Sequence, residues 1–464
     1  MTATAAGPAA AALSLLDHAG QTLRLALPVM LARAGLVILI TVDTVMCGAA
    51  GGDTLAYYGA SLGPHITMLT VGIGLLTGTV VYVAQMAGAG RPQECGRIWR
   101  RALGIAGTLG TAYLVLLLFG REILRLLGQH PDVVEEGGRA LVLFGPGMPA
   151  MLMYVATSFF LEGIGRPKPG MVITLSANLI NAGLNWAMIF GHVGLPAMGA
   201  AGATLATSIT RWWMLAMIVG YVLTMPDRRR YGVGGADSGR PAIGVAQLMR
   251  LGVPFAMAIG IETSTFSGMA AIAGVISVAA LAAYQVALNY MALVYMLALG
   301  LSTATAIRVA HAVGRRDGPA VRRAGWVGAG LVAGLMTMVG ILTWVGRAAI
   351  AFAYTQDQAV LALAIGALGI AALITVLDGT QGVLIGALRG ASDAIVPTLV
   401  YGLSFWIVSL PIAWWFGVRL GHGVPALMWG LFAGLVMASA LLAWRFARLS
   451  QRLFASAPGG PSRA

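Results

Sequence analysis

Long apolar segments separated by short polar breaks make up most of this chain. Most of them span about 20–30 residues, which as a helix is enough to cross ~30 Å of hydrocarbon. The pattern therefore predicts twelve transmembrane helices and no strands. The segments are residues 23–48, 55–86, 98–120, 139–162, 170–190, 197–224, 246–273, 277–307, 321–345, 359–387, 394–417 and 424–446.

Only one connection between these segments is long, and it divides them into six and six. It runs from Met225 to Pro241, is rich in Gly and Arg and has no apolar periodicity, which is typical of a solvent-exposed linker. We therefore expect four regions. These are an N-terminal lobe at 1–224, a cytoplasmic linker at 225–245, a C-terminal lobe at 246–448 and a disordered cytoplasmic tail at 449–464.

The two halves resemble each other in sequence. The matched segments are 81–102 with 306–325, Leu27-Pro28 with Val253-Pro254 and, less closely, 160–171 with 388–397. Because each half has an even number of helices, both halves enter the membrane from the same side. This predicts an all-α polytopic membrane protein made of two parallel-repeat six-helix bundles, an arrangement that many secondary transporters use.

Composition and charge support a membrane protein and give its orientation. Of the residues, 58% are hydrophobic and only 10% are charged, against about 25% charged in soluble domains. The net charge of +13 does not indicate a nucleic-acid partner, because the basic residues are spread over short loops. With both termini in the cytoplasm, 22 of the 29 Lys and Arg residues fall on the cytoplasmic side, as the positive-inside rule requires.

Three acidic residues lie deep inside the apolar segments: Asp43, Glu262 and Asp378. A carboxylate in lipid is costly and normally faces a protein interior or a wet cavity where it has a function. Glu262 is twelve residues from Arg250, and Asp378 is eleven from Arg389, so both lie ~16–18 Å from the inner edge and could face one cavity. Asp43 lies nearer the outer side. The repeat places no acid opposite any of the three, which argues against a role shared by both halves.

Cation exchange is the chemistry that such residues predict. A carboxyl group held away from water keeps a proton more readily near neutral pH, and once ionised it binds Na⁺ or an organic cation. Glu262 and Asp378 are a candidate Na⁺ site. Polar residues at helical spacing are candidate supporting ligands, and the alternative is that they join helices. They are Asn181, Asn185, Thr207, Gln285 and Asn289.

Two other polar residues inside the apolar segments favour structural roles. Arg33 lies nine residues from the inner edge, and its long side chain favours snorkelling to the membrane surface. His65 is interpreted as a polar group satisfied within the protein rather than as a proton relay. Cys47 and Cys95 are predicted to lie on opposite sides of the membrane, so we expect no disulfide between them.

Five segments together resemble the multidrug and toxic compound extrusion (MATE) family, in its bacterial NorM-type branch. They are LPVMLARAGLVILITVDTVMCG, VAQMAGAGRP, VPFAMAIGIETSTFSGMA, QVALNYMALVYM with TAIRVAHAVG, and DGTQGVLIGALRGASDA.

The resemblance implies two lobes around a central cleft that opens alternately inward and outward, and export of cationic amphipathic drugs in antiport with Na⁺ or H⁺. The family's functional acids match Asp43, Glu262 and Asp378. An amino-lobe cation site of relatives matches Asn181 and Thr207, and Asn185 stands where some members carry an acid.

The resemblance and the residues together predict a multidrug efflux antiporter in the bacterial inner membrane. We expect it to act as a monomer on small organic cations, in contact with membrane lipid, without a cofactor or nucleic acid. The alternative is a flippase for a lipid-linked sugar, whose cleft would carry basic residues for an anionic headgroup. The deep acids favour the antiporter. An intramembrane hydrolase with paired acids is disfavoured because HExxH and Cys/His clusters are missing from the sequence.

Overall fold

The computed structural model describes residues 15–234 and 243–453, and this part of the chain is helical with no strand. Ten of its helices are long and apolar enough to cross a membrane, and two bent pairs of shorter helices, counted as one span each, bring the number to twelve. The predicted class, an all-α polytopic membrane protein with twelve spans, is confirmed.

The described part of the first half, residues 15–234, forms nine helices. Their bounds are α1 Leu15–Ala50, α2 Gly52–Leu76, α3 Gly78–Gly88, α4 Pro92–Leu117, α5 Gly120–Leu126, α6 Pro131–Phe144, α7 Gly147–Gly163, α8 Lys168–Phe190 and α9 Gly199–Thr224. Helices α2 and α3 form one span, whereas α4 with α5 and α6 with α7 are the bent pairs.

The second half forms longer, straighter spans. Their bounds are α10 Val245–Ile276, α11 Val278–Gly314, α12 Gly318–Tyr354, α13 Gln358–Gly390, then α14 Ile395–Tyr401, η1 Gly402–Ser409, α15 Leu410–Trp414 and η2 Trp415–Arg419 as one span, and α16 Gly423–Arg452. The π-helical turns of η1 come directly before Pro411, whose ring nitrogen has no hydrogen to donate to the helix ladder.

The end of α16 corrects one prediction. Residues 449–452 continue the helix; Leu449 packs against the hydrophobic core of the second half, and Ser450 is buried. The prediction of disorder is therefore wrong for these four residues, because the apolar stripe of the helix continues past the last strongly apolar run. Residues 454–464 of the predicted tail lie outside the described residues.

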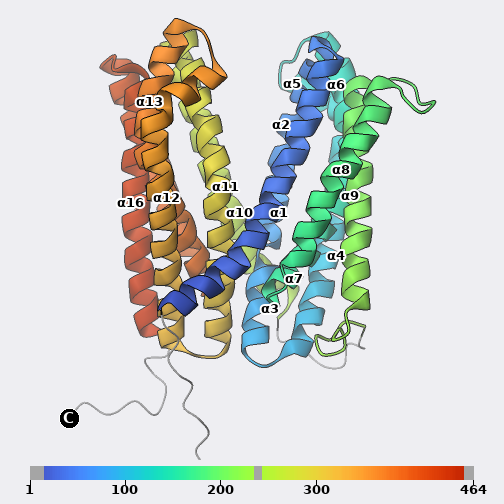
Figure 1. Ribbon diagram of the computed structural model, residues 1–464, viewed down its shortest axis with the longest axis vertical. Coiled ribbons are helices and arrows are strands. Elements are labelled where there is room, and N and C mark those ends of the chain that lie inside the picture. Colours follow the sequence, from blue (N-terminus) through green and yellow to red (C-terminus); the bar gives the residue numbers. More distant parts are fainter. Residues whose placement is uncertain (1–14, 235–242, 454–464) are drawn as a thin grey trace, which may run out of the picture.

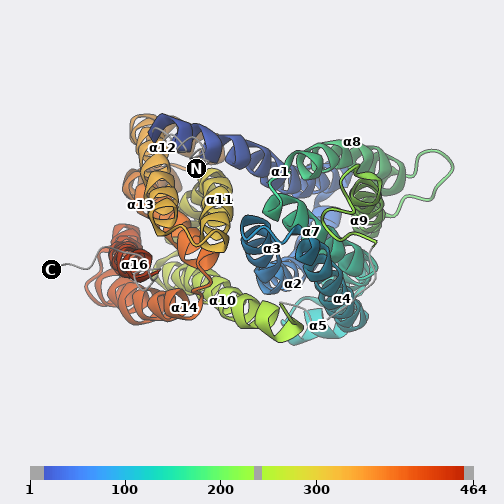
Figure 2. The ribbon, with the colours of Figure 1, turned by 90° about the horizontal axis from the view of Figure 1, so that it is seen from below.

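The helices form two bundles that meet at one end and diverge at the other. Figure 1 shows α2–α9 in one bundle and α11–α16 in the other, with α1 beginning and α16 ending at the narrow lower end. Helix α1 packs on α11 and α12 and also on α8 (Figure 2), and α10 packs on α2 and α3 and also on α14. Each of these two helices contains a proline, Pro28 or Pro254. They therefore tie the bundles together, so each crosses the lobe boundary predicted from the sequence.

At the narrow end the two bundles exchange matching contacts. Gln85 of α3 donates to the carbonyl of Gly390 at 2.9 Å, and Nε2 of His311 in α11 hydrogen-bonds the carbonyl of Gly163 at 2.8 Å. Gln85 and His311 occupy equivalent positions, VAQ and VAH, in the two repeats. The repeat in the sequence is thus visible as a reciprocal pair of hydrogen bonds that closes this end.

Close backbone approach also requires a glycine on each side of this closure. A Cβ on Gly314 would collide with the carbonyl oxygen of Gln85. We expect Gly314→Ala to separate the bundles at the narrow end. Spin labels at the exposed positions Arg91 and Arg316, read by pulsed electron spin resonance, should then show a longer distance in most molecules. Gly330→Ala is the control, since its Cβ meets nothing within 4 Å. An unchanged distance distribution in Gly314→Ala would contradict the closure.

The first half of the long connection packs under the N-terminal bundle. Asp227 forms an ion pair with Arg166 at 2.7 Å, the carbonyl of Tyr231 accepts from the amide of Gly96, and Val233 is buried. This part is anchored to the protein rather than being a fully solvated linker. The rest of the predicted linker, 235–242, lies outside the described residues.

Candidate functional site

A cavity of about 420 Å³ lies between the two bundles. Its walls come from α1, α2, α3, α7 and α9 on one side and from α10, α11, α13 and α14 on the other. Most of the lining is apolar, but four charged side chains reach it: Arg33, Arg211, Glu262 and Arg389. Pockets for drug-sized molecules hold about 300–1,000 Å³, so the cavity fits one such molecule.

Asp43 of α1 lies in a buried polar cluster inside the N-terminal bundle. Its side chain accepts three hydrogen bonds: from Asn185 of α8 at 2.6 Å, from Thr207 of α9 at 2.7 Å and from Tyr58 of α2 at 3.3 Å. Asn181 completes the cluster, because it donates to Thr207 and accepts from Asn185. The structure thus brings together Asp43, Asn181, Asn185 and Thr207, and adds Tyr58, which the sequence did not single out.

This cluster has the chemistry of a small cation site. All three hydrogen bonds to Asp43 are donated to its carboxyl oxygens, an arrangement that suits the ionised form. The amide oxygen of Asn185 has no partner within the described residues, which leaves an additional oxygen beside the carboxylate. Hard cations take oxygen ligands of these kinds.

Arg211 lies beside this cluster and reaches the cavity. It interacts electrostatically with Asp43 and Tyr58 without an ion pair within 4 Å, and its guanidinium lies 5.6 Å from the centre of the Phe144 ring. His65 also stacks on Phe144, at 3.9 Å, and neither ring nitrogen of His65 has a hydrogen-bond partner among the described residues. The interpretation of His65 as a satisfied polar group is therefore wrong.

Glu262 and Asp378 lie together in the C-terminal bundle. Glu262 of α10 is in the cavity wall, whereas Asp378 of α13 is buried, does not line the cavity and accepts a hydrogen bond from Gln381 at 3.1 Å. The two carboxyl groups interact electrostatically, and Tyr295 and Tyr401 lie within electrostatic range of both. The structure thus brings the two acids together, but only Glu262 touches the cavity directly.

Two of the candidate supporting ligands lie outside both this cavity and the Asp43 cluster. Gln285 and Asn289 are exposed on α11, and Asn289 accepts a hydrogen bond from Tyr354 at 3.0 Å. They precede Met296, which lines the cavity, by eleven and seven residues and so share its helix face. They lie farther along α11 from the narrow end, where the bundles diverge (Figure 1).

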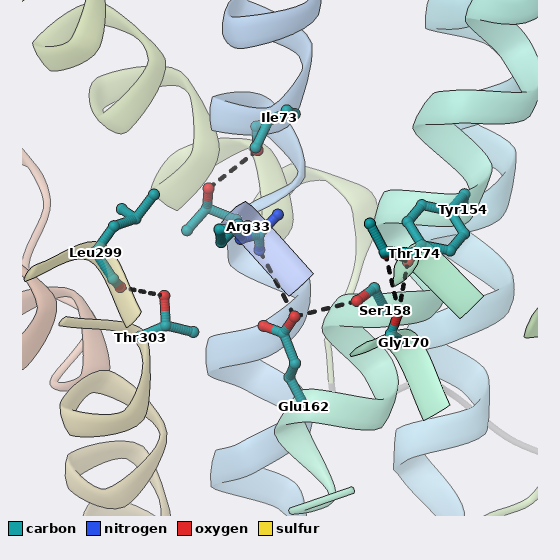
Figure 3. Close-up of polar contacts among 10 residues, drawn as sticks. Arg33, Ile73, Tyr154, Ser158, Glu162, Gly170, Thr174, Leu299 and Thr303 are labelled. Carbon is teal, nitrogen blue, oxygen red and sulfur yellow. Dashed lines mark hydrogen bonds and ion pairs between the residues drawn. The ribbon is translucent and has the colours of Figure 1, made fainter. Parts of the chain in front are cut away.

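Glu162 is a buried acid that the sequence did not single out. It lies at the end of α7 and its side chain is 3% exposed; Oε1 is 3.6 Å from Nη2 of Arg33 and accepts from Ser158 at 3.1 Å (Figure 3). Arg33 also lies over the ring of Phe159. The snorkelling interpretation of Arg33 is wrong, because its guanidinium pairs inside the protein. The sequence feature that could have identified Glu162 as a buried acid is its position as the last residue of an apolar segment.

Arg389 corrects the expected inner edge of α13. The sequence places it in the first polar break after Asp378, yet the helix continues to Gly390 and buries it. Its guanidinium lies 4.6 Å from the centre of the Phe255 ring and reaches the cavity, and its Nε has no hydrogen-bond partner among the described residues.

We expect Glu162→Gln to destabilise the protein, because it leaves the Arg33 guanidinium uncompensated in a largely buried position. Breaking a buried pair by removing one partner costs about 3–5 kcal/mol; with Arg33 14% exposed we expect about 3 kcal/mol. Glu135→Gln is the control, since Arg121 and Glu135 are half-exposed and such a pair contributes about 0–1 kcal/mol. The measurement is reversible unfolding in detergent. Equal losses in the two variants would contradict this role of Glu162.

Two helix bundles, a cavity between them and buried acids in each bundle define a polytopic carrier. The MatE family model matches residues 28–187 and 254–415. The chain is 35% identical to the probable multidrug resistance protein NorM of Caulobacter vibrioides over 93% of this chain and 92% of that protein. It is 31% identical to the multidrug resistance protein NorM of Burkholderia vietnamiensis over 98% of each. The chain therefore belongs to the MATE family, in its bacterial NorM-type branch.

Solved structures agree with this fold. The MATE transporter VcmN of Vibrio cholerae in its bent form superimposes with a TM-score of 0.84 at 16% identity, over 94% of this chain and 98% of that one. A MOP superfamily transporter from Pyrococcus furiosus gives a TM-score of 0.85 at 18% identity, over 93% and 96%. The protein is a multi-pass membrane transporter.

Proposed function

We propose that this protein is a multidrug efflux antiporter that exports organic, mostly cationic amphipathic compounds in exchange for Na⁺ or H⁺. The observation that carries the proposal is Glu262. Its carboxyl group stands in an otherwise mostly apolar cavity wall shared by both bundles, and it interacts electrostatically with the buried Asp378. Membership of the NorM-type branch adds support, because its relatives are named multidrug resistance proteins.

The arrangement supports exchange by competition. An organic cation in the cavity and a small cation on the acids both bind to the same negative charge. Glu262 and Asp378 therefore cannot bind both cations tightly at the same time. Binding of one then favours release of the other, and reorientation of the bundles carries each across in opposite directions. Asp43 supplies a second cation site in the other bundle, with Asn181, Asn185 and Thr207 as its ligands.

Orientation and partners follow from the same proposal. With both termini in the cytoplasm of a bacterium, the narrow end that α1 and α16 share lies at the inner face and the bundles diverge outward (Figure 1). The described conformation is then outward-facing. The protein would work as a monomer in the inner membrane, with its exposed apolar side chains in lipid and small organic cations as substrates.

One observation favours the alternative, a flippase for a lipid-linked sugar. The cavity carries three guanidinium groups, from Arg33, Arg211 and Arg389, besides the carboxyl group of Glu262. The sequence indicated that the deep charges of the second half are acidic, and Arg389, which lines this cavity from that half, corrects that expectation. An anionic headgroup would bind to these arginines but would be repelled by Glu262. The antiporter therefore explains the buried acids better than the flippase does.

The test is transport by purified protein in liposomes. Efflux of a fluorescent organic cation is followed with a pH gradient alone, with a Na⁺ gradient alone and with neither. We expect one gradient to drive efflux against the cation gradient, and protein-free liposomes to show none. Drive by neither gradient, together with gradient-independent movement of a lipid-linked sugar pyrophosphate, would replace the antiporter with the flippase.

A further inference from the structure

A second pocket lies at the narrow end of the molecule, where the two bundles meet. It holds about 610 Å³, and among the described residues none lines both this pocket and the central cavity. Its walls come from the start of α1, the turn between α7 and α8 and the end of α9, and from the end of α11 and the start of α12 in the other bundle. Figure 2 views the molecule from this end. The pocket therefore bridges the two bundles at their closure.

The lining of this pocket is strongly basic, and no acidic residue of the described chain contributes to it. A basic inner end is expected of any membrane protein, but these side chains come from α1 and from both bundles and meet at one pocket. Asp227 pairs with Arg166 at 2.7 Å. The side chains of Arg24, Lys168 and Arg315 form no ion pair within 4 Å and no hydrogen bond within the described ranges. The basic lining residues are Arg24, Arg166, Lys168, Arg308 and Arg315.

Arg308 is held in position at the wall of this pocket. It donates to Oγ1 of Thr22 and to Oε1 of Gln21, both in α1, and Arg315 lies within electrostatic range of it. Like charges that are brought together repel one another, and an anion between them offsets the repulsion. Phosphate suits such a site because arginine binds its oxygens with paired hydrogen bonds. The geometry therefore favours a phosphate group as the ligand.

The size and the apolar part of the pocket favour a phosphate group that is carried by a lipid. A phosphate ion is only a few water molecules in size, and a water molecule occupies about 30 Å³ in the liquid, so the pocket is larger than a free phosphate ion needs. Leu25 and Tyr221 also line it, and beside them on α1 the side chains of Leu23 and Leu27 are 47% and 58% exposed. Basic pockets between transmembrane helices on the cytoplasmic side suit anionic headgroups.

We propose that this pocket binds the phosphate group of an anionic phospholipid, and that the bound lipid holds the narrow end closed. Lys168 belongs to the N-terminal bundle and Arg315 to the C-terminal one, so a phosphate between them attracts both bundles. His311, which closes this end through the carbonyl of Gly163, also lines the pocket. A ligand that binds only the closed arrangement increases its population. In the orientation proposed above, the lipid comes from the inner leaflet and the favoured state is outward-facing.

Binding is measured by native mass spectrometry of the purified full-length protein in a neutral detergent. The ligands are short-chain phosphatidylglycerol, phosphatidylcholine with the same acyl chains, and inorganic phosphate. We expect one phosphatidylglycerol to bind at least about tenfold more tightly than either of the others, because the pocket attracts a net negative charge and the chains add apolar contact.

Two double variants separate this pocket from general attraction to a basic surface. Arg24→Gln combined with Lys168→Gln should weaken phosphatidylglycerol binding at least about tenfold. Both positions are exposed, so the fold should persist, and unchanged phosphatidylcholine binding and thermal unfolding report that it does. Arg322→Gln combined with Arg323→Gln is the matched control. It removes the same charge from exposed positions of α12 that do not line the pocket, and phosphatidylglycerol binding should be unchanged.

The closing effect of the lipid is measured with spin labels at positions 91 and 316, on opposite sides of the narrow end, in nanodiscs of phosphatidylglycerol or of phosphatidylcholine. We expect the short distance to be more populated in phosphatidylglycerol. The variant with Arg24→Gln and Lys168→Gln should give the same distribution in both lipids.

Several results would overturn the inference. Equal affinity for the two lipids would remove the anionic site, and inorganic phosphate that binds as tightly as phosphatidylglycerol would replace the lipid with a soluble anion. Equal losses in the two double variants would reduce the binding to general surface attraction. Phosphatidylglycerol that binds without changing the distance distribution would remove the closing role. None of these measurements depends on drug transport, so the proposed efflux function stands or fails separately.

Discussion

Asp43→Asn should abolish ion-driven efflux, with a loss of at least about 100-fold, while the protein stays folded. The carboxylate accepts from Asn185, Thr207 and Tyr58. An amide has one acceptor oxygen instead of two, and its NH₂ group must face donors. The substitution also removes the only negative charge of the cluster. Losing about 3 kcal/mol of cation binding corresponds to roughly 100-fold.

The measurement for Asp43→Asn is efflux from loaded liposomes together with thermal unfolding in detergent. Unfolding should change little, because burying an amide costs less than burying a charge. Asp53→Asn is the control, since it makes the same chemical change at an exposed position of α2. Efflux within threefold of wild type in Asp43→Asn would show that this cluster only holds helices together.

Replacing the acids of the C-terminal bundle should give losses that do not add. We expect Glu262→Gln and Asp378→Asn each to lower ion-driven efflux by at least about 100-fold. Efflux by the double variant should be no slower than efflux by the less active of the two single variants, because the effects of residues that act as one unit are not additive. Their electrostatic interaction is the structural reason.

For wild type, the two single variants and the double variant, we measure the rate of efflux in liposomes and the drug resistance of cells that express equal amounts of protein. Glu122→Gln, an exposed site in α5, is the control. Losses that multiply in the double variant would mean that the two acids act independently, and normal efflux in either single variant would remove that residue from the coupling step.

The twelve spans could be predicted because burial in lipid leaves a signal in every residue of a segment. A run of apolar residues long enough to cross the bilayer has few other interpretations. The ends were less certain: α11 continues to Gly314 and α12 to Tyr354, beyond the apolar runs, because protein packing supports polar turns there. The crossing of α1 and α10 between the bundles depends on contacts between distant segments, and local periodicity carries no information on those.

The acids of the site were visible for the same reason, since a charge inside an apolar run is conspicuous. Their partners were less visible. The contact of Asn185 with Asp43 joins residues 142 positions apart, and neither the residue pattern nor the family resemblance predicted it. Arg389 was misplaced because an arginine just after an apolar run normally marks the membrane surface, and Glu162 was overlooked because it stands at the end of such a run. Sequence pattern alone does not distinguish a charge at a helix end that faces water from one that faces a cavity.

The central claim is that substrate and coupling ion compete for the buried acids, and ion release on substrate binding tests it most directly. An organic cation is added to purified protein in weakly buffered solution, while a pH indicator and a Na⁺-selective electrode follow the two ions. The account predicts release of H⁺ or Na⁺ that saturates with binding in wild type and disappears in Glu262→Gln. Saturable binding that releases neither ion would contradict it.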